Sequence, residues 1–242
     1  TLHVVCRRLK TLLRSPEFGQ QRVDSGLAEY GLVVAGGERD YRPTADCSIF
    51  TGGRWRPIAP LSGRRHSACS AIVEDEDGQP EMWVMGGAGG PGNSLATVEA
   101  YNPRTNTWRS CLPLSQRRFG AVAGVVGGRL VVAGGTGGFG PLTSVEAYTP
   151  TGWTALPPLP HAAYNATACV LNGRLYIMGG FQCNKLQVLE LSQENQFGSW
   201  SLKADLPART APAEQHGDSI LLNTANCASV VHEGKIWLLK PG

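Results

Sequence analysis

Short apolar runs that end in two glycines recur along this chain. The runs are LVVAGG (residues 32–37), MWVMGG (82–87), LVVAGG (130–135) and LYIMGG (175–180), and their glycine pairs follow one another at intervals of 45 to 50 residues. A fixed period of this length is typical of stacked copies of one supersecondary unit. The sequence therefore predicts an array of repeats whose structural glycines are Gly36, Gly37, Gly86, Gly87, Gly134, Gly135, Gly179 and Gly180.

Each copy is predicted to form four short antiparallel strands, a to d. In the clearest copy, strand a spans residues 119–126, strand b 130–133 and strand c 144–148, and strand d lies around Trp153. Gly127-Gly128 joins strands a and b as a two-residue hairpin turn, because glycine tolerates the positive φ that such turns require. Strand d carries a tryptophan in all four copies, at Trp55, Trp108, Trp153 and Trp200.

One such sheet cannot bury both of its faces, so neighbouring copies are expected to stack around a common axis. The glycine pair suits a point where the backbone turns sharply and another element approaches closely. The tryptophan supplies a large apolar surface between sheets. The first copy has no clear strand a, and the fifth has only strands a and b. The two chain ends could therefore complete one sheet together, or one sheet could be incomplete.

Composition narrows the function classes. The chain has 242 residues, of which 42% are hydrophobic, enough for a packed core, and a net charge of +3, too small to indicate a nucleic-acid or membrane partner. No apolar stretch is long enough to span a bilayer. The seven cysteines include no CxxC pair, which favours a reducing compartment, cytoplasmic or nuclear.

The first residues do not share the repeat and are predicted to be helical. Apolar residues recur there at steps of three and four, which is the period of one helix face. They are Leu2, Val5, Cys6, Leu9, Leu12 and Leu13. The helix should end at Ser15-Pro16, since the residue before a proline is disfavoured in the α region. We expect a helical segment at residues 1–25 and the repeat array at 26–242. The chain starts at Thr1 and not at Met, so the existence of an upstream part is left open.

Strand direction alternates in such a sheet, so the loops sort onto two faces. The b–c and d–a loops share one face, here called the loop face, and the a–b and c–d turns share the other, the turn face. The loops that differ between copies lie on the loop face, where binding is expected to concentrate. The candidate partner-binding residues there are Arg64, Arg65, Arg117, Arg118, His161 and Arg209. The arginines either grip carboxylates or phosphorylated groups of a partner, or bond neighbouring loops and hold the sheets together.

No catalytic or metal motif is found. The five histidines have no metal-ligand spacing, and GxSxG, P-loop and HExxH motifs are absent. We expect no catalytic residues, no metal site and no cofactor.

The repeat closely resembles the kelch repeat: the apolar run into Gly-Gly, the aromatic residue of strand c, the tryptophan of strand d and the Leu-Pro exit all match. The resemblance covers about residues 32–237. It implies an all-β fold, a kelch-type β-propeller with four clear blades and a partial or end-closed fifth. Copper-dependent and iron-dependent kelch enzymes exist, but Leu222 stands where the iron site would need a histidine after Glu214 and Asp218.

The first segment is similar to the closing part of an F-box, through Val5-Cys6-Arg7 and residues 12–18 (LLRSPEF). F-box/kelch proteins have this order of elements. The resemblance implies a substrate-recognition subunit of a cullin-type (SCF) ubiquitin ligase, in which the helix binds the adaptor subunit and the propeller binds the protein to be ubiquitylated. A kelch scaffold or cytoskeletal assembly subunit without a ligase role is the alternative, and a metal-dependent kelch enzyme is a third hypothesis.

Overall fold

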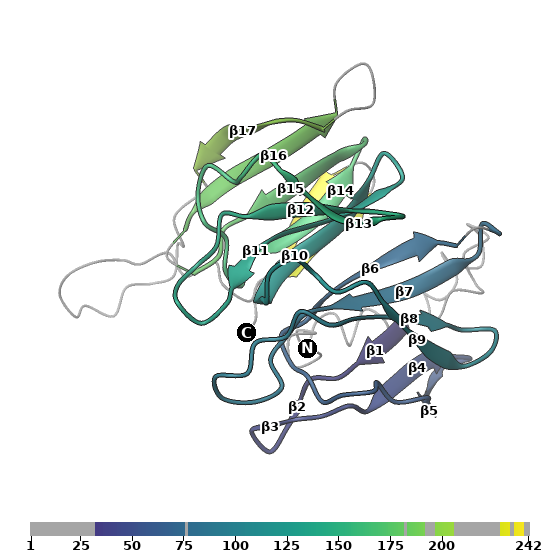
Figure 1. The fold of residues 1–242 in the computed structure, drawn as a ribbon. Helices are drawn as coiled ribbons and strands as arrows, with labels where there is room; N and C mark the ends of the chain where they lie inside the picture. Colours follow the sequence, from purple (N-terminus) through teal and green to yellow (C-terminus); the bar gives the residue numbers. More distant parts are fainter. Residues whose placement is uncertain are drawn as a thin grey trace, which may run out of the picture.

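The structure is a computed structural model that describes residues 32–75, 77–181, 183–191, 197–205, 228–232 and 235–239. Every regular element in these ranges is a β-strand (Figure 1). Accordingly, these ranges hold no helix that could cross a membrane. The predicted helical segment at residues 1–25, with its proposed adaptor-binding positions, lies outside the described residues, as does Arg209.

Three sheets have the four strands that the repeat predicts, and consecutive strands pair antiparallel in each. We number the sheets as blades 1 to 5 in chain order. Blade 2 contains β6 (Cys69–Glu74), β7 (Pro80–Met85), β8 (Val98–Asn102) and β9 (Thr107–Cys111). Blade 3 contains β10 (Phe119–Val126), β11 (Arg129–Thr136), β12 (Val145–Thr149) and β13 (Gly152–Leu156). Blade 4 contains β14 (Thr167–Leu171), β15 (Arg174–Met178), β16 (Lys185–Leu191) and β17 (Phe197–Asp205).

The first and last sheets have fewer described strands. Blade 1 pairs β1 (Leu32–Ala35), β4 (Cys47–Thr51) and β5 (Arg54–Ile58), and its b–c loop forms a small hairpin of β2 (Glu38–Arg39) and β3 (Arg42–Pro43). Blade 5 consists of β18 (Ala228–His232) and β19 (Lys235–Leu239). Within the described ranges β18 and β19 pair only with each other and not with β1. The pairing of the two chain ends in one blade is therefore not seen there.

The first strands of blades 2 to 5 lie next to one another. β6 contacts β10, β10 contacts β14 and β14 contacts β18, while the last strand of each complete blade lies at the sheet's outer edge (Figure 1). Apolar side chains fill the space between successive blades. Between blades 3 and 4 the fully buried residues include Val126, Val131, Leu175 and Ile177. The blades thus stack face to face in chain order, as the repeat predicts.

The strand d tryptophans occupy equivalent positions. The indole Nε1 donates to a carbonyl at the exit of the preceding blade: Trp108 to Ala59 O (2.7 Å), Trp153 to Leu112 O (2.9 Å) and Trp200 to Pro157 O (2.9 Å). Each of the three rings also packs in the apolar cluster between its blade and the one before it. Trp55, in the first described blade, is 42% exposed. The predicted role of the tryptophan between sheets is confirmed at these three junctions.

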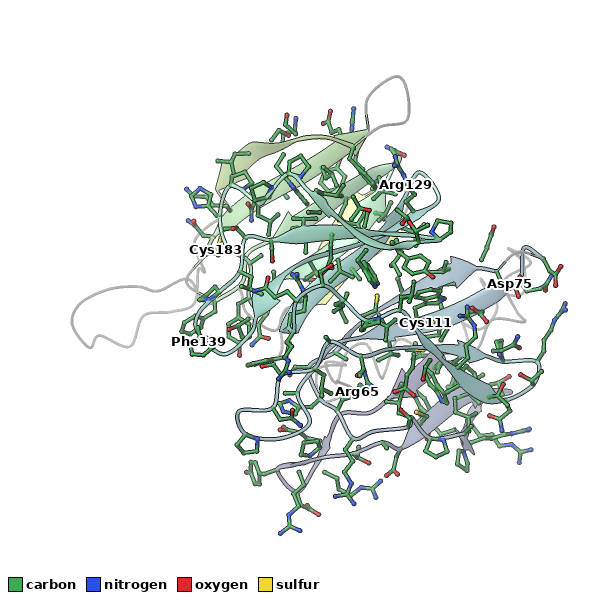
Figure 2. The ribbon with its side chains drawn as sticks, viewed as in Figure 1. Arg65, Asp75, Cys111, Arg129, Phe139 and Cys183 are labelled. Carbon is green, nitrogen blue, oxygen red and sulfur yellow. The ribbon has the colours of Figure 1, made fainter. Side chains whose placement is uncertain are left out.

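The loops sort onto two faces as predicted. Phe139 and Cys183, in the b–c loops of blades 3 and 4, lie on one side of the molecule, at the left of Figure 2. Asp75 and Arg129, beside the a–b turns of blades 2 and 3, lie on the other side. The loop face and the turn face are thus distinct surfaces.

Candidate functional site

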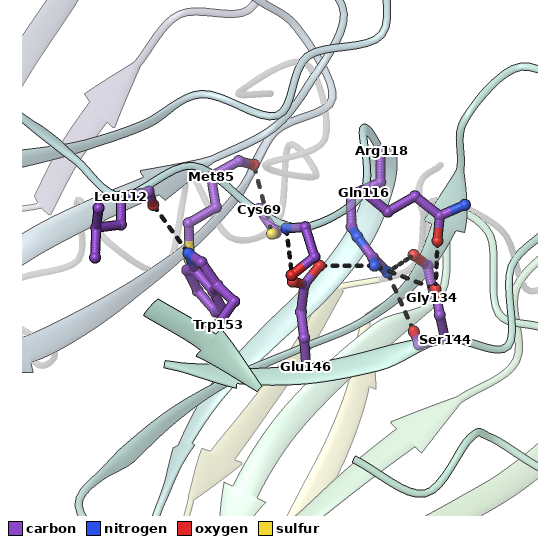
Figure 3. A network of polar contacts seen from close by, with 10 residues as sticks. Cys69, Met85, Leu112, Gln116, Arg118, Gly134, Ser144, Glu146 and Trp153 are labelled. Atoms are coloured by element: carbon purple, nitrogen blue, oxygen red, sulfur yellow. Dashed lines mark hydrogen bonds and ion pairs between the residues drawn. The ribbon is translucent and has the colours of Figure 1, made fainter. Parts of the chain in front are cut away.

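Arg118 is fully enclosed in blade 3 (Figure 3). Its side chain is 1% exposed, Nη1 donates to Gly134 O (2.8 Å) and Ser144 O (3.1 Å), and Nη2 forms an ion pair with Glu146 Oε1 (2.8 Å). The second carboxylate oxygen, Glu146 Oε2, accepts from Ser115 N at 2.9 Å. Both charges are thus buried, and each is paired and hydrogen-bonded.

Arg65 repeats this arrangement one blade earlier. Its Nη1 donates to Gly86 O and Thr97 O, both at 3.1 Å, and its Nη2 pairs with Glu99 Oε1. Ser62 N donates to Glu99 Oε2 at 2.9 Å. Burial lowers the pKa of the Arg65 guanidinium, and the Glu99 carboxylate opposes that shift. The guanidinium remains charged, because arginine titrates far above neutral pH.

The backbone of each arginine joins the preceding blade. Gly37 N donates to Arg65 O, and Gly87 N donates to Arg118 O, both at 2.8 Å. The carbonyl lies so close that a Cβ on the first glycine of the pair would be 2.5 Å from it at Gly36 and 2.3 Å at Gly86. The glycine pair is therefore needed for this approach, as the sequence predicts.

These contacts separate the two proposed roles of the arginines. Arg65 and Arg118 join two blades each and are closed to solvent, so they leave the candidate partner-binding set. Their neighbours Arg64 and Arg117 are exposed in the loops of the loop face, as is His161. The partner-binding role of these three exposed residues stays a prediction.

The junction between blades 3 and 4 has a different composition. Ala163 occupies the arginine position, because its carbonyl accepts from Gly135 N at 2.6 Å. Gln187, which is 0% exposed, replaces the glutamate of strand c. Its Oε1 accepts from His161 N (2.9 Å) and its Nε2 donates to His161 O (3.0 Å). A neutral amide thus satisfies this junction without an ion pair.

A line of backbone hydrogen bonds connects the loops near the first strands. Ser67, Gly120 and Asn165 each lie two residues beyond the arginine position, and all three have positive φ, at 51°, 60° and 52°. Gly120 N donates to Ser67 O, and Asn165 N donates to Gly120 O, both at 2.8 Å. The d–a loops therefore share one fixed register from blade to blade.

Arginine and aromatic side chains are exposed on the loop face. The described b–c and d–a loops that follow Ile58, in blades 2 to 4, contain no aspartate or glutamate, while Arg64 and Arg117 are exposed there. Three aromatic residues of the b–c loops also project: Tyr41 is 97%, Phe139 107% and Phe181 44% exposed. The repeat pattern does not identify these aromatics, because they lie in the loops that do not repeat.

A ladder of aromatic rings follows the junction between blades 3 and 4. The ring centroids of Phe119 and Tyr164 are 5.6 Å apart, and those of Tyr164 and Phe181 are 6.0 Å apart. Edge-to-face pairs at such distances stabilise the loops that carry them. Phe181 is thereby presented on the loop face by a packed base.

The described residues offer no evident reaction centre. They contain no group of three or more His, Cys, Asp or Glu that could hold a metal ion. Cys69 is buried and donates to Met85 O at 3.6 Å, and burial raises the pKa of its thiol to about 12 (Figure 3). Such a thiol carries negligible thiolate at neutral pH. The site that the structure does present is a rigid face of loops.

Comparison with known proteins agrees with this architecture. The Kelch motif matches residues 79–114 and 117–160. The chain is 34% identical to human Kelch-like protein 33 over 57% of its own length and 28% of that protein. It is 34% identical to the F-box/kelch-repeat protein At1g67480 of Arabidopsis thaliana, over 35% of its own length and 21% of that protein. The chain thus spans less than a third of these two relatives.

A solved structure shows the same fold. The protein in "Structure of YjhT" superposes with a TM-score of 0.61 over 86% of this chain and 70% of that one, at 15% sequence identity. The period, the four-stranded sheets, the glycine pairs and the matched motif lead to one conclusion: this chain contains kelch repeats.

Proposed function

We propose that the chain is a non-catalytic interaction module whose loop face binds a partner protein. The observation that carries the proposal is the composition of that face: exposed arginines and aromatic rings on loops that are fixed at their bases. Tyrosine and arginine are enriched at protein–protein interfaces and among the residues that dominate binding energy. A rigid base also lowers the entropy lost on binding.

Charge reversal on matched faces tests this proposal. The double variant Arg64→Glu/Arg117→Glu changes two exposed arginines of the loop face, and Arg54→Glu/Arg104→Glu makes the same change in net charge near the turn face. We expect the first variant to lose partner proteins in affinity purification from cells and the second to keep them. Both variants should melt within a few degrees of the wild type. Equal loss, or no loss, in the two variants would contradict the proposal.

The finer proposal is a substrate-recognition subunit of a cullin-type ubiquitin ligase. It is supported by the F-box-like residues 2–22 directly before the repeats and by the similarity to an F-box/kelch-repeat protein. We expect the full-length protein to co-purify with the cullin adaptor, and Leu9→Glu/Leu12→Glu to abolish this association while the loop-face partner is retained. The action would then take place in the cytoplasm or nucleus.

A kelch scaffold without a ligase role is the second candidate, favoured by the same loop face. It predicts that the adaptor never co-purifies, while the loop-face partner does. A metal-dependent enzyme would instead show stoichiometric iron or copper in elemental analysis of the purified protein.

A further inference from the structure

The b–c loop of blade 1 ends in a hairpin whose tip is strained. β2 and β3 are joined by Asp40 and Tyr41 alone, with Arg39 paired to Arg42, and both tip residues have positive φ, 51° and 58°. A two-residue turn of this kind favours glycine at the second position, because a bulky side chain is disfavoured at positive φ. Tyr41 nevertheless stands there, and it is 97% exposed. The ring therefore costs stability and gains no packing within the described structure.

The base of this hairpin is firmly held. Thr44 N donates to Gly37 O at 3.0 Å, and Arg65 N donates to Thr44 O at 3.0 Å. Arg39 pairs with Asp46 at 3.1 Å, and Glu38 lies 3.7 Å from His66 Nδ1. The tip is thus presented in one direction on the loop face.

The b–c loop of blade 3 presents a second aromatic ring in the same way. Phe139 lies between Gly138 and Gly140 and is 107% exposed. The Thr136 hydroxyl closes this loop, because it donates to Gly140 O (2.8 Å) and accepts from Gly138 N (3.2 Å). The loop of blade 2 lies between the two in chain order, and its tip, residues 88–93, has the sequence AGGPGN without a bulky apolar side chain.

We propose that Tyr41 and Phe139 are two apolar anchors that insert into pockets of a folded partner protein. The inference rests on the proposed function of the loop face and adds the partner's chemistry. A ring that projects fully from its own surface is buried most completely in an apolar pocket of the other molecule. A folded domain offers such pockets, whereas an extended peptide covers only part of the ring. The charges of the hairpin balance, since Glu38 and Asp40 offset Arg39 and Arg42, so it lacks the basic cluster that attracts an anionic lipid surface.

Photo-cross-linking locates the partner. A photoreactive phenylalanine analogue is placed at position 41, at position 139, or at position 77 on the turn face as the matched control. We expect the first two sites to cross-link the same protein in cells and the control site not to. Cross-linking of the same proteins from all three sites, or of none from the tips, overturns the inference.

Binding of the purified, cross-linked protein then tests the anchors. Tyr41→Ala and Phe139→Ala should each weaken binding about 30-fold or more, as expected for a central aromatic anchor. Tyr41→Phe should stay close to wild type. Changes below twofold overturn the inference, and they leave the proposed function intact if Arg64→Glu/Arg117→Glu still weakens binding. If the purified protein does not bind the wild-type chain at all, both proposals fail.

Two further measurements separate the alternatives. Tyr41→Gly should raise the melting temperature by about 2 °C, because it relieves the positive φ at an exposed position. An unchanged or lower melting temperature would show that the turn is not strained, and this would overturn the inference. Wild-type binding to phosphatidylcholine–phosphatidylserine vesicles that Tyr41→Ala abolishes would assign the tips to a membrane and overturn the protein-pocket inference.

Discussion

The junctions between blades share one backbone contact but are filled by two kinds of side chain, charged or neutral. At the first two junctions Arg65–Glu99 and Arg118–Glu146 form buried ion pairs, whereas at the third the uncharged Ala163 and Gln187 occupy these positions. The backbone is the same in all three, since a glycine N–H bonds the carbonyl at the arginine position. The comparison shows that the backbone contact defines the junction, while the side-chain filling can change as a set.

The third junction differs from the first two at three positions: Pro160 replaces the serine, Ala163 the arginine and Gln187 the glutamate. The glutamates receive a hydrogen bond from Ser62 N or Ser115 N, one residue after the exit leucine. Pro160 stands at that position in the third junction and has no N–H to donate. A carboxylate at position 187 would lack both its cation and this donor. The glutamine avoids the buried charge and uses both ends of its amide on His161 instead.

The largest expected effect is the loss of one partner of an ion pair. Arg118→Ala leaves Glu146 buried without its cation, which costs about 3–5 kcal/mol of unfolding free energy. Gln187→Ala at the neutral junction should cost about 1–3 kcal/mol, because only neutral hydrogen bonds are lost. Urea unfolding of the two variants checks this order. The double variant Arg118→Ala/Glu146→Gln should regain part of the loss, and equal losses for the two single variants would remove the distinction between the junctions.

A charge introduced at the neutral junction should be nearly as harmful. In Gln187→Glu the buried carboxyl has no cation, so its pKa rises in the folded protein above the unfolded value of about 4.3. A raised pKa means that stability is retained below pH 4.3 and lost as the pH increases, by about 3–4 kcal/mol at pH 7. Unfolding measured at pH 4 and pH 7 tests the sign. Ala163→Arg in the same chain should reduce the pH dependence.

The glycine pair should respond alike at both kinds of junction. A Cβ would lie 2.3 Å from Arg118 O in Gly86→Ala and 2.2 Å from Ala163 O in Gly134→Ala, and both positions have positive φ. Each variant should lose about 2–3 kcal/mol. Gly128→Ala, which also has positive φ but open space around it, is the control, with an expected cost of about 1 kcal/mol. A large difference between Gly86→Ala and Gly134→Ala in thermal unfolding would mean that the side chains, and not the backbone, define the junction.

The smallest effect concerns the Cys69 thiol beside the Arg118–Glu146 pair. Burial raises the pKa of this thiol from 9.0 to about 12. The folded state therefore holds the proton more tightly, and its contribution to stability is complete below pH 9 and decreases as the pH rises toward 12. Between pH 9 and pH 10 the wild type should lose about 1 kcal/mol more than Cys69→Ala. Parallel slopes for the two proteins would place the thiol in contact with water.

The repeat itself was predictable, because each of its marks answers a physical need that recurs in every copy. Gly86 must admit a carbonyl, and Trp108 must fill the space between two sheets and find an acceptor. Which arginine of each neighbouring pair is buried was not predictable from chemistry alone, since Arg64 and Arg65 are neighbours of the same type. One signal was present in the sequence. Arg65 and Arg118 each precede a copy with a glutamate in strand c, whereas Ala163 precedes the copy that has Gln187 there.

The exposed anchors could not be derived from the sequence, because they do not recur from copy to copy. Tyr41 and Phe139 lie in loops of different length and composition, so no comparison between copies identifies them. Only the backbone shows that Tyr41 occupies a strained turn. The helical segment at residues 1–25 and Arg209 lie outside the described residues, and their predicted roles stay predictions.

The hydrogen-bonded line through Ser67, Gly120 and Asn165 has a consequence for how such a protein can diversify. In these three d–a loops each member fixes the position of the next inner strand, so a residue added between the exit leucine and this line would shift that strand against its neighbour. The b–c loops are bonded to the d–a loops at their bases, but their tips lie outside this line and differ in length between copies. New recognition sequences can therefore be grafted at the tip around residues 137–141 without disturbing the stacking of the blades.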